Sequence, residues 1–113
     1  MSEQGFTPPD GVRSNAKRGL ELRQKYNRGG TQVGVARARD LSNGASLSLS
    51  TIKRMNSYFS RHEVDKKGRG WAQGEEGFPS AGRIAWELWG GDVGRDWAAR
   101  IVARINRENL SSQ

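Results

Sequence analysis

The chain has 113 residues, with 19 Lys or Arg against 12 Asp or Glu, which gives a formal net charge of +7 and a pI near 10.6. This length suits one domain and leaves no room for an elaborate enzyme. The absence of cysteine excludes disulfide frameworks and thiolate metal sites. There is no secretion signal and no apolar segment long enough to span a bilayer, so we expect an intracellular protein without membrane association.

The surplus of positive charge favours polyanionic partners. Each phosphate contact releases condensed counterions, and this draws a basic protein toward nucleic acid. The same surplus also occurs in many soluble proteins that bind no nucleic acid, so charge alone leaves both interpretations open.

The first part of the chain predicts a lead-in followed by a helix. Residues 1–8 are polar and aperiodic and are expected to be flexible, ahead of a single helical domain over residues 9–108. A helix is expected from Pro9 to Tyr26, because proline fits a first helical turn and apolar residues recur near one face. Gly19 lies within this helix, which indicates either close packing by a neighbouring helix or local weakness.

The run TQVGVARARDLSNG fits either a helix or a strand, because its apolar residues also alternate. We predict a helix capped by Thr31 and ended by Gly44. An isolated strand could not satisfy its backbone groups, and no second strand-like run is present to pair with it.

The run ASLSLSTIKRMNSYFSRHEV gives the clearest helix, with Ser48 or Ser50 as its cap. The predicted apolar stripe consists of Ile52, Met55 and Phe59, flanked by Tyr58 and His62. Lys53, Arg54 and Arg61 lie off this stripe. They form either an ordinary solvated face or a face that contacts phosphates.

Residues 65–79 are rich in glycine and nearly free of aliphatic side chains, which predicts a long loop. The loop begins with the cations Lys66, Lys67 and Arg69. Trp71 and Phe78 can anchor it by burying their rings. An anchored basic loop beside a basic helix suits nucleic-acid contact, whereas a mobile loop would only add solubility.

Residues 80–99 predict a helix, Gly-Gly, helix corner, here named the Trp-Gly corner. Ser80 caps the first helix, Gly90 and Gly91 end it, and Asp92 caps the second. The predicted stripe of the second helix consists of Val93, Trp97, Ile101, Val102 and Ile105, and Trp86, Trp89 and Trp97 are expected in the core. Such corners occur in DNA-binding helix-turn-helix modules, but Asp92 and Asp96 would repel phosphates in the first turn, so we interpret the corner as a scaffold.

The last helix carries a second basic ridge, formed by Arg100, Arg104 and Arg107, with Glu108 one turn after Arg104. This ridge suits either a phosphate backbone or a solvated helix end. Residues 109–113 are expected to fray.

The three residues His62, Glu63 and Asp65 are the one cluster that resembles a metal or catalytic site. A small metal-dependent nuclease or lyase is one interpretation. However, neighbouring side chains on a helix diverge, and the chain has one histidine and no cysteine. It also has no P-loop and no nucleophile elbow. We expect no enzyme activity, no metal and no cofactor.

Three segments of the sequence are distinctive: GGTQVGVARARDLSNG, STIKRMNSYFSRHEVDKKG and GEEGFPSAGRIAWELWGGDVGRDWA. They resemble a domain that recurs in bacteriophage and prophage proteins, alone or fused to virion-associated proteins such as head maturation proteases. The resemblance covers about residues 8–104. It implies a viral origin and a self-contained domain that is located in the host cytoplasm or in the virion. The resemblance assigns no catalytic residue to this chain.

Together these features predict a compact all-α bundle of about five short helices with one long Gly-rich loop. The expected function is nucleic-acid binding, with DNA preferred to RNA, mainly through phosphate contacts. The expected contact residues are Lys53, Arg54, Arg61, Lys66, Lys67, Arg69, Arg100 and Arg104. The alternative is a protein-interaction or virion-structural module, in which the basic surface and the loop around Trp71 and Phe78 bind a phage or host protein.

Overall fold

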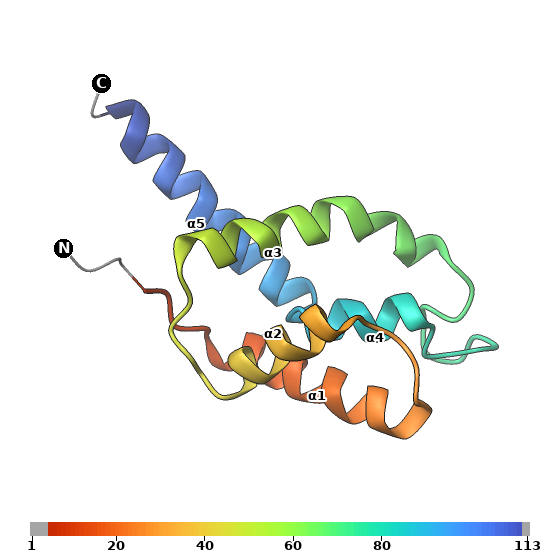
Figure 1. Ribbon diagram of the computed structural model, residues 1–113. Helices are drawn as coiled ribbons and strands as arrows, with labels where there is room; N and C mark the ends of the chain where they lie inside the picture. The colour runs from red at the N-terminus through yellow and green to blue at the C-terminus, as the bar shows by residue number, and fades with distance from the viewer. Residues whose placement is uncertain (1–4, 112–113) are drawn as a thin grey trace.

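The computed structural model describes residues 5–111, and within them the chain forms five α-helices and a short 3₁₀ helix (Figure 1). In chain order these are α1 (Asp10–Tyr26), α2 (Gln32–Ser42), α3 (Leu49–His62), η1 (Glu63–Lys67), α4 (Ala81–Leu88) and α5 (Gly91–Ser111). The predicted all-α bundle is confirmed, and the run that fitted either a helix or a strand forms α2.

Side-chain caps fix where three of the helices begin. The hydroxyl oxygens of Thr31, Ser48 and Ser80 accept hydrogen bonds from the amides of Gly34 (3.2 Å), Thr51 (3.2 Å) and Arg83 (3.0 Å). Each bond gives an acceptor to an amide that has no partner within the helix. Of the two serines predicted as possible caps of this helix, Ser48 is therefore the cap. Pro9 occupies the position before α1, so this helix begins one residue later than predicted.

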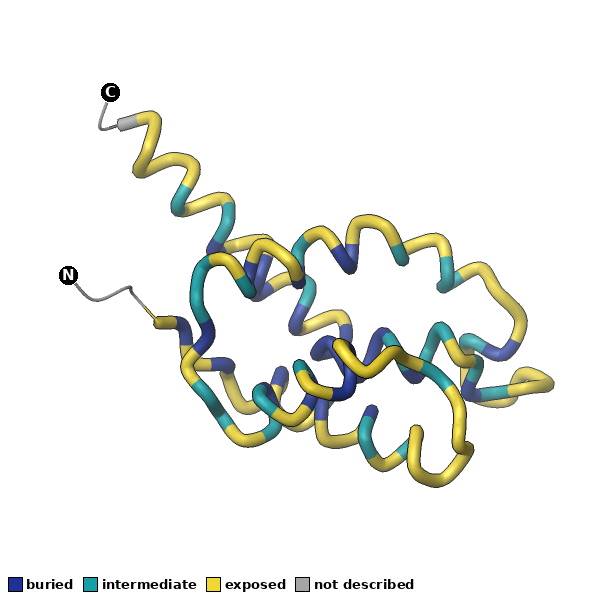
Figure 2. Tube along the Cα trace, viewed as in Figure 1, coloured by how far each residue is buried: buried dark blue, intermediate teal, exposed yellow. Residues whose placement is uncertain are grey.

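The core lies where α1 packs against α2 and α4, and α3 packs against α5. Trp86 is its central side chain, with 1% of its surface exposed, and it meets the ring of Phe59 edge to face at 4.8 Å. Trp89 and Trp97 are also buried, which confirms their predicted place in the core. Figure 2 shows that exposed residues follow the outer faces of the helices and dominate the end of α5.

Gly19 allows α1 and α4 to approach closely. A Cβ atom at this position would lie 2.5 Å from the backbone nitrogen of Leu88 and 2.8 Å from its Cα. Of the two interpretations of this glycine, close packing by a neighbouring helix is the correct one.

The Trp-Gly corner forms as predicted, with α4 ending at Leu88 and α5 beginning at Gly91. Gly90 and Gly91 have positive φ angles of 114° and 68°, which glycine adopts without the steric penalty of a side chain. Asp92 is not the N-cap, because α5 already includes Gly91.

Val93 was predicted to join the core but is 44% exposed. The buried stripe of α5 runs instead through Gly94, Trp97, Ala98 and Ile101. At about 100° per residue, the centre of that stripe lies roughly 90° from Val93. The predicted stripe has nearly the same centre, roughly 80° from Val93, so its direction was correct and Val93 lies at its solvent-exposed edge.

The ends of the domain extend further than predicted. The expected lead-in falls partly on residues 1–4, which lie outside the described residues, but Phe6 is buried and its backbone pairs with Leu47 through two hydrogen bonds of 2.8 Å. The expected tail also remains helical as far as Ser111, and residues 112–113 lie outside the described part. Figure 1 shows this last part of α5 projecting away from the body of the domain.

The predicted loop begins later than expected, because η1 occupies Glu63–Lys67. The loop is closed at its base by a hydrogen bond of 2.8 Å from the Ser80 amide to the Gly70 carbonyl. Trp71 packs edge to face on Trp86 at 5.6 Å. The predicted anchoring of the loop by Trp71 is thus confirmed.

Candidate nucleic-acid interface

A hollow of about 470 Å³ separates the first turn of α2 from α3. We call it the α2–α3 groove, and its lining consists of Thr31, Val33, Lys53, Arg54, Ser57, Tyr58, Arg61 and Trp89. No Cα atom of α2 lies within 8 Å of a Cα atom of α3, and both helices belong to the described part of the chain. The two helices are therefore held apart, and aromatic side chains fill only the bottom of the space between them.

One wall of the groove is the cationic face of α3. Ile52, Met55 and Phe59 are buried on one side of this helix, which turns Lys53, Arg54 and Arg61 toward solvent. Among residues 5–111, none of these three cations has a hydrogen-bond or ion-pair partner. Lys53 and Arg61 are eight positions apart, which corresponds to about 12 Å along the helix axis. The wall thus presents three unpaired cations to a ligand.

The opposite wall is the start of α2. Thr31 caps this helix, and Val33, in its first turn, is 57% exposed. The first amides of a helix carry partial positive charge, so this wall adds to the positive potential of the groove. A Cβ atom at Gly34 would lie 3.2 Å from the indole nitrogen of Trp89, so glycine allows the helix start to sit against the groove floor.

Tyr58 and Trp89 line the floor of the groove, and together with His62, which does not line it, they form a column of three stacked rings, here named the ring column. The Tyr58 ring lies 4.6 Å from the Trp89 ring at 9° and 4.5 Å from the His62 ring at 25°. Trp89 and Tyr58 are buried, whereas the His62 side chain is 44% exposed. Burial, with a smaller contribution from the charge of Asp65, raises the pKa of Tyr58 far above its ordinary value, so the phenol stays neutral.

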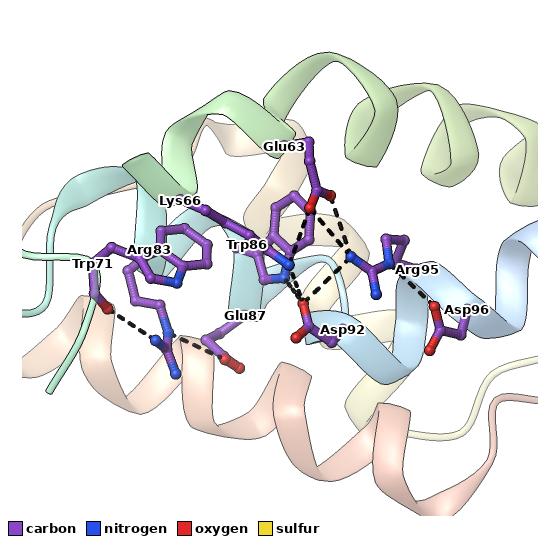
Figure 3. Close-up of polar contacts among 9 residues, drawn as sticks. All are labelled: Glu63, Lys66, Trp71, Arg83, Trp86, Glu87, Asp92, Arg95 and Asp96. Atoms are coloured by element: carbon purple, nitrogen blue, oxygen red, sulfur yellow. Dashed lines mark hydrogen bonds and ion pairs between the residues drawn. The ribbon is translucent and has the colours of Figure 1, made fainter. Parts of the chain in front are cut away.

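Lys66 was expected to contact phosphates, but the structure places it in an intramolecular polar network (Figure 3). Its ammonium lies 3.0 Å from Asp92 and 3.2 Å from Glu63, and 4.8 Å from the centre of the Trp86 ring. Asp92 also accepts a hydrogen bond of 2.9 Å from the Trp86 indole. These contacts join η1, α4 and α5, so we leave Lys66 out of the proposed interface.

The charges in this network also affect Asp92 itself. Burial on its own raises the pKa of Asp92, but hydrogen bonds from Lys66 and Trp86 and the charges of Lys66 and Arg95 lower it on balance. Asp92 was predicted as a helix cap, and its observed partners give it a tertiary role instead.

A second part of the network surrounds Glu87, which is 4% exposed. The sequence analysis did not identify this residue as buried or functional. Arg83 lies 3.7 Å from the Glu87 carboxylate and donates a hydrogen bond of 2.9 Å to the Trp71 carbonyl (Figure 3). Desolvation raises the pKa of Glu87, and the charges of Arg83 and Arg18 offset only part of that effect. Arg83 therefore ties the loop to α4 beside a buried carboxyl group.

The remaining predicted contact residues lie elsewhere. Lys67 and Arg69 are exposed, and neither lines the α2–α3 groove. Arg100 and Arg104 line a separate hollow of about 490 Å³ on α5, together with Arg107, Trp97, Ile101 and Ala103. The structure thus brings Lys53, Arg54 and Arg61 together and leaves the other cations apart.

The three candidate metal ligands do not converge. The Nδ1 atom of His62 lies 3.1 Å from Asp65, but Glu63 turns toward Lys66 at 3.2 Å and Arg95 at 3.3 Å. Residues 5–111 contain no group of three His, Cys, Asp or Glu residues positioned to hold a metal ion. These three side chains therefore do not form together the metal site that the sequence offered as one interpretation.

Sequence reasoning found the cationic face of α3 but missed the groove. Thr31 was identified as a cap and Trp89 as a core residue, and nothing in their sequence positions indicates that they face α3. The spacing of Tyr58 and His62 by one helical turn was a usable signal for their stacking.

Comparison of the chain with models of known protein families, with curated proteins and with solved structures gives no match. None of the helices in the described part of the chain combines the length and apolar character needed to cross a membrane.

Proposed function

We propose that this protein binds nucleic acid through the α2–α3 groove, mainly by contacts to phosphates. The observation that supports this most directly is the set of three exposed cations, Lys53, Arg54 and Arg61, on one wall of a hollow. Cations without intramolecular partners give up no ion pair when they contact phosphates. The proposed role is binding and involves no catalysis, and DNA in a phage setting is the expected target.

The test compares two variants that lose the same formal charge. The groove variant is Lys53→Ala, Arg54→Ala and Arg61→Ala together. The control variant is Lys17→Ala, Lys25→Ala and Arg39→Ala, which removes three exposed cations outside the groove. Binding to labelled DNA and RNA, single-stranded and duplex, is measured by fluorescence anisotropy over a range of salt concentrations.

Three phosphate contacts give a slope of log K against log salt of about −2 to −3. The groove variant should lose most of this slope, because each removed contact reduces it by about 1, and the control variant should keep it. Equal weakening in the two variants would show that net charge, rather than the groove, determines binding. Absence of binding at low salt to every nucleic acid tested would refute the proposed function.

The end of α5 favours a second candidate, an acidic protein partner. Arg100, Arg104 and Arg107 line a hollow on this helix with the largely buried Trp97 and Ile101, and Leu110 is 72% exposed. A row of arginines near an exposed leucine is complementary to an acidic amphipathic segment. The discriminating result is a complex with a phage or host protein that survives nuclease treatment and is lost in Arg100→Glu, Arg104→Glu.

A further inference from the structure

The exposed end of the ring column is His62, which follows the last cation of the groove wall but does not itself line the groove. His62 follows Arg61 at the C-terminal end of the cationic wall. One face of its imidazole is covered by Tyr58, and its Nδ1 edge is held by Asp65 at 3.1 Å. The side chain is nevertheless 44% exposed, so part of its surface is open to a ligand.

A flat ring held in this way is suited to stacking. Tyr58 and Asp65 fix the orientation of the imidazole, so little conformational freedom remains to be lost when another ring covers it. Stacking of a base on an aromatic side chain is tolerant of sequence, because every base has a π face. The exposed surface of His62 can therefore accept any unpaired base.

From this geometry we infer that the α2–α3 groove takes single-stranded nucleic acid, with phosphates on Lys53, Arg54 and Arg61 and, beyond the end of the groove at Arg61, one base stacked on the exposed surface of His62. This inference rests on the proposed function. A duplex keeps its bases paired and stacked on one another, whereas a single strand presents them to protein rings. Val33, exposed on the opposite wall, adds apolar surface that suits bases better than phosphates.

The test separates base contacts from phosphate contacts in both the protein and the ligand. The probe is an oligothymidylate of roughly 12 nucleotides, within the site sizes common for single-strand binding proteins. Its controls are an oligomer of equal length whose residues are abasic, which keeps the phosphates, and a duplex of the same length. The protein variants are His62→Ala and His62→Phe, with the thermal unfolding midpoint of each measured to establish that it is folded.

Loss of one stacked base weakens binding by about 5- to 150-fold. We expect His62→Ala to lose this factor on oligothymidylate and almost nothing on the abasic oligomer, and His62→Phe to restore most of the affinity. The salt slope should stay unchanged in both variants, because His62 supplies no phosphate contact in this arrangement.

The outcomes distinguish this inference from the proposed function. Equal binding of the abasic oligomer and oligothymidylate, or tighter binding of the duplex, would overturn the stacking inference while leaving phosphate binding in place. An equal loss on both oligomers in His62→Ala would also overturn it, because that result indicates a structural role. Absence of binding to all three ligands would overturn both proposals.

Discussion

Replacement of Gly19 by alanine tests the packing of α1 on α4. In the interior of an exposed helix, a change from glycine to alanine stabilises the folded state by about 1 kcal/mol. Here the added methyl group would lie 2.5 to 2.8 Å from three backbone atoms of Glu87 and Leu88. Backbone atoms cannot move aside as a flexible side chain can, so the two helices must separate.

The expected net effect is destabilisation. Overpacking of a well-packed site costs typically 1–3 kcal/mol, and clashes with three backbone atoms place Gly19→Ala near the upper end of that range. After subtraction of the propensity gain, the free energy of unfolding should fall by about 2 kcal/mol. For a domain of this size, this corresponds to a fall of roughly 8 °C in the unfolding midpoint.

Gly11→Ala is the matched control, because it lies in the same helix. A Cβ atom there meets no closer atom than the Val93 side chain at 3.7 Å, which is an ordinary contact. This variant should be as stable as the original protein or slightly more stable. Both variants are followed by circular dichroism during thermal and urea unfolding. A Gly19→Ala variant that gains stability would refute the close helix packing described above.

Three further predictions concern caps and titrating groups. Ser48→Ala should lose about 1 kcal/mol of stability, whereas Ser50→Ala, two positions later and exposed, should lose at most a few tenths, as measured by urea unfolding. Because the pKa of Glu87 is higher in the folded chain, its charged form opposes folding as the pH rises, so Glu87→Gln should raise the unfolding midpoint at neutral pH. That gain should disappear below about pH 4, where the glutamic acid is protonated in the unfolded chain as well. Folding lowers the pKa of Asp92, so its carboxylate stabilises the folded state at pH values above its unfolded pKa. Asp92→Asn should therefore lower the unfolding midpoint at neutral pH. The difference from the original protein should shrink as the pH falls below about 4. A constant offset between either Asp92 or Glu87 variant and the original protein across the titration would contradict the corresponding prediction.

Local patterns in the sequence were sufficient to identify the helices. Caps such as Thr31 and Ser80, and the glycines at residues 90 and 91, act on groups within a few positions of themselves, so their effects follow from spacing alone. The cationic face of α3 could also be predicted, because an amphipathic helix turns its polar residues away from its buried stripe.

The tertiary structure decides whether each cation is free to contact a ligand or is held by an intramolecular partner. Lys66 and Lys67 are neighbours in a basic run, yet Lys66 is held by Asp92 from α5 while Lys67 is exposed. Glu63 lies within one helical turn of both lysines, so spacing alone does not distinguish them, and the contact of Lys66 with Asp92 is made 26 positions later in the sequence. The width of the buried stripe on α5 likewise depends on which neighbours pack against it, so Val93 at its edge was wrongly assigned to the core.

The sequence by itself therefore determined the number and kind of the helices, the Trp-Gly corner and the cationic face of α3. Only the tertiary structure decided that Thr31 and Trp89 complete a groove with that face, and that His62 ends a column of stacked rings. The physical reason is the distance along the chain over which each kind of interaction acts. Helix formation and capping act over one or two turns, whereas the groove depends on how the helices pack, and this packing is set by contacts between residues far apart in the chain, such as Gly19 and Leu88.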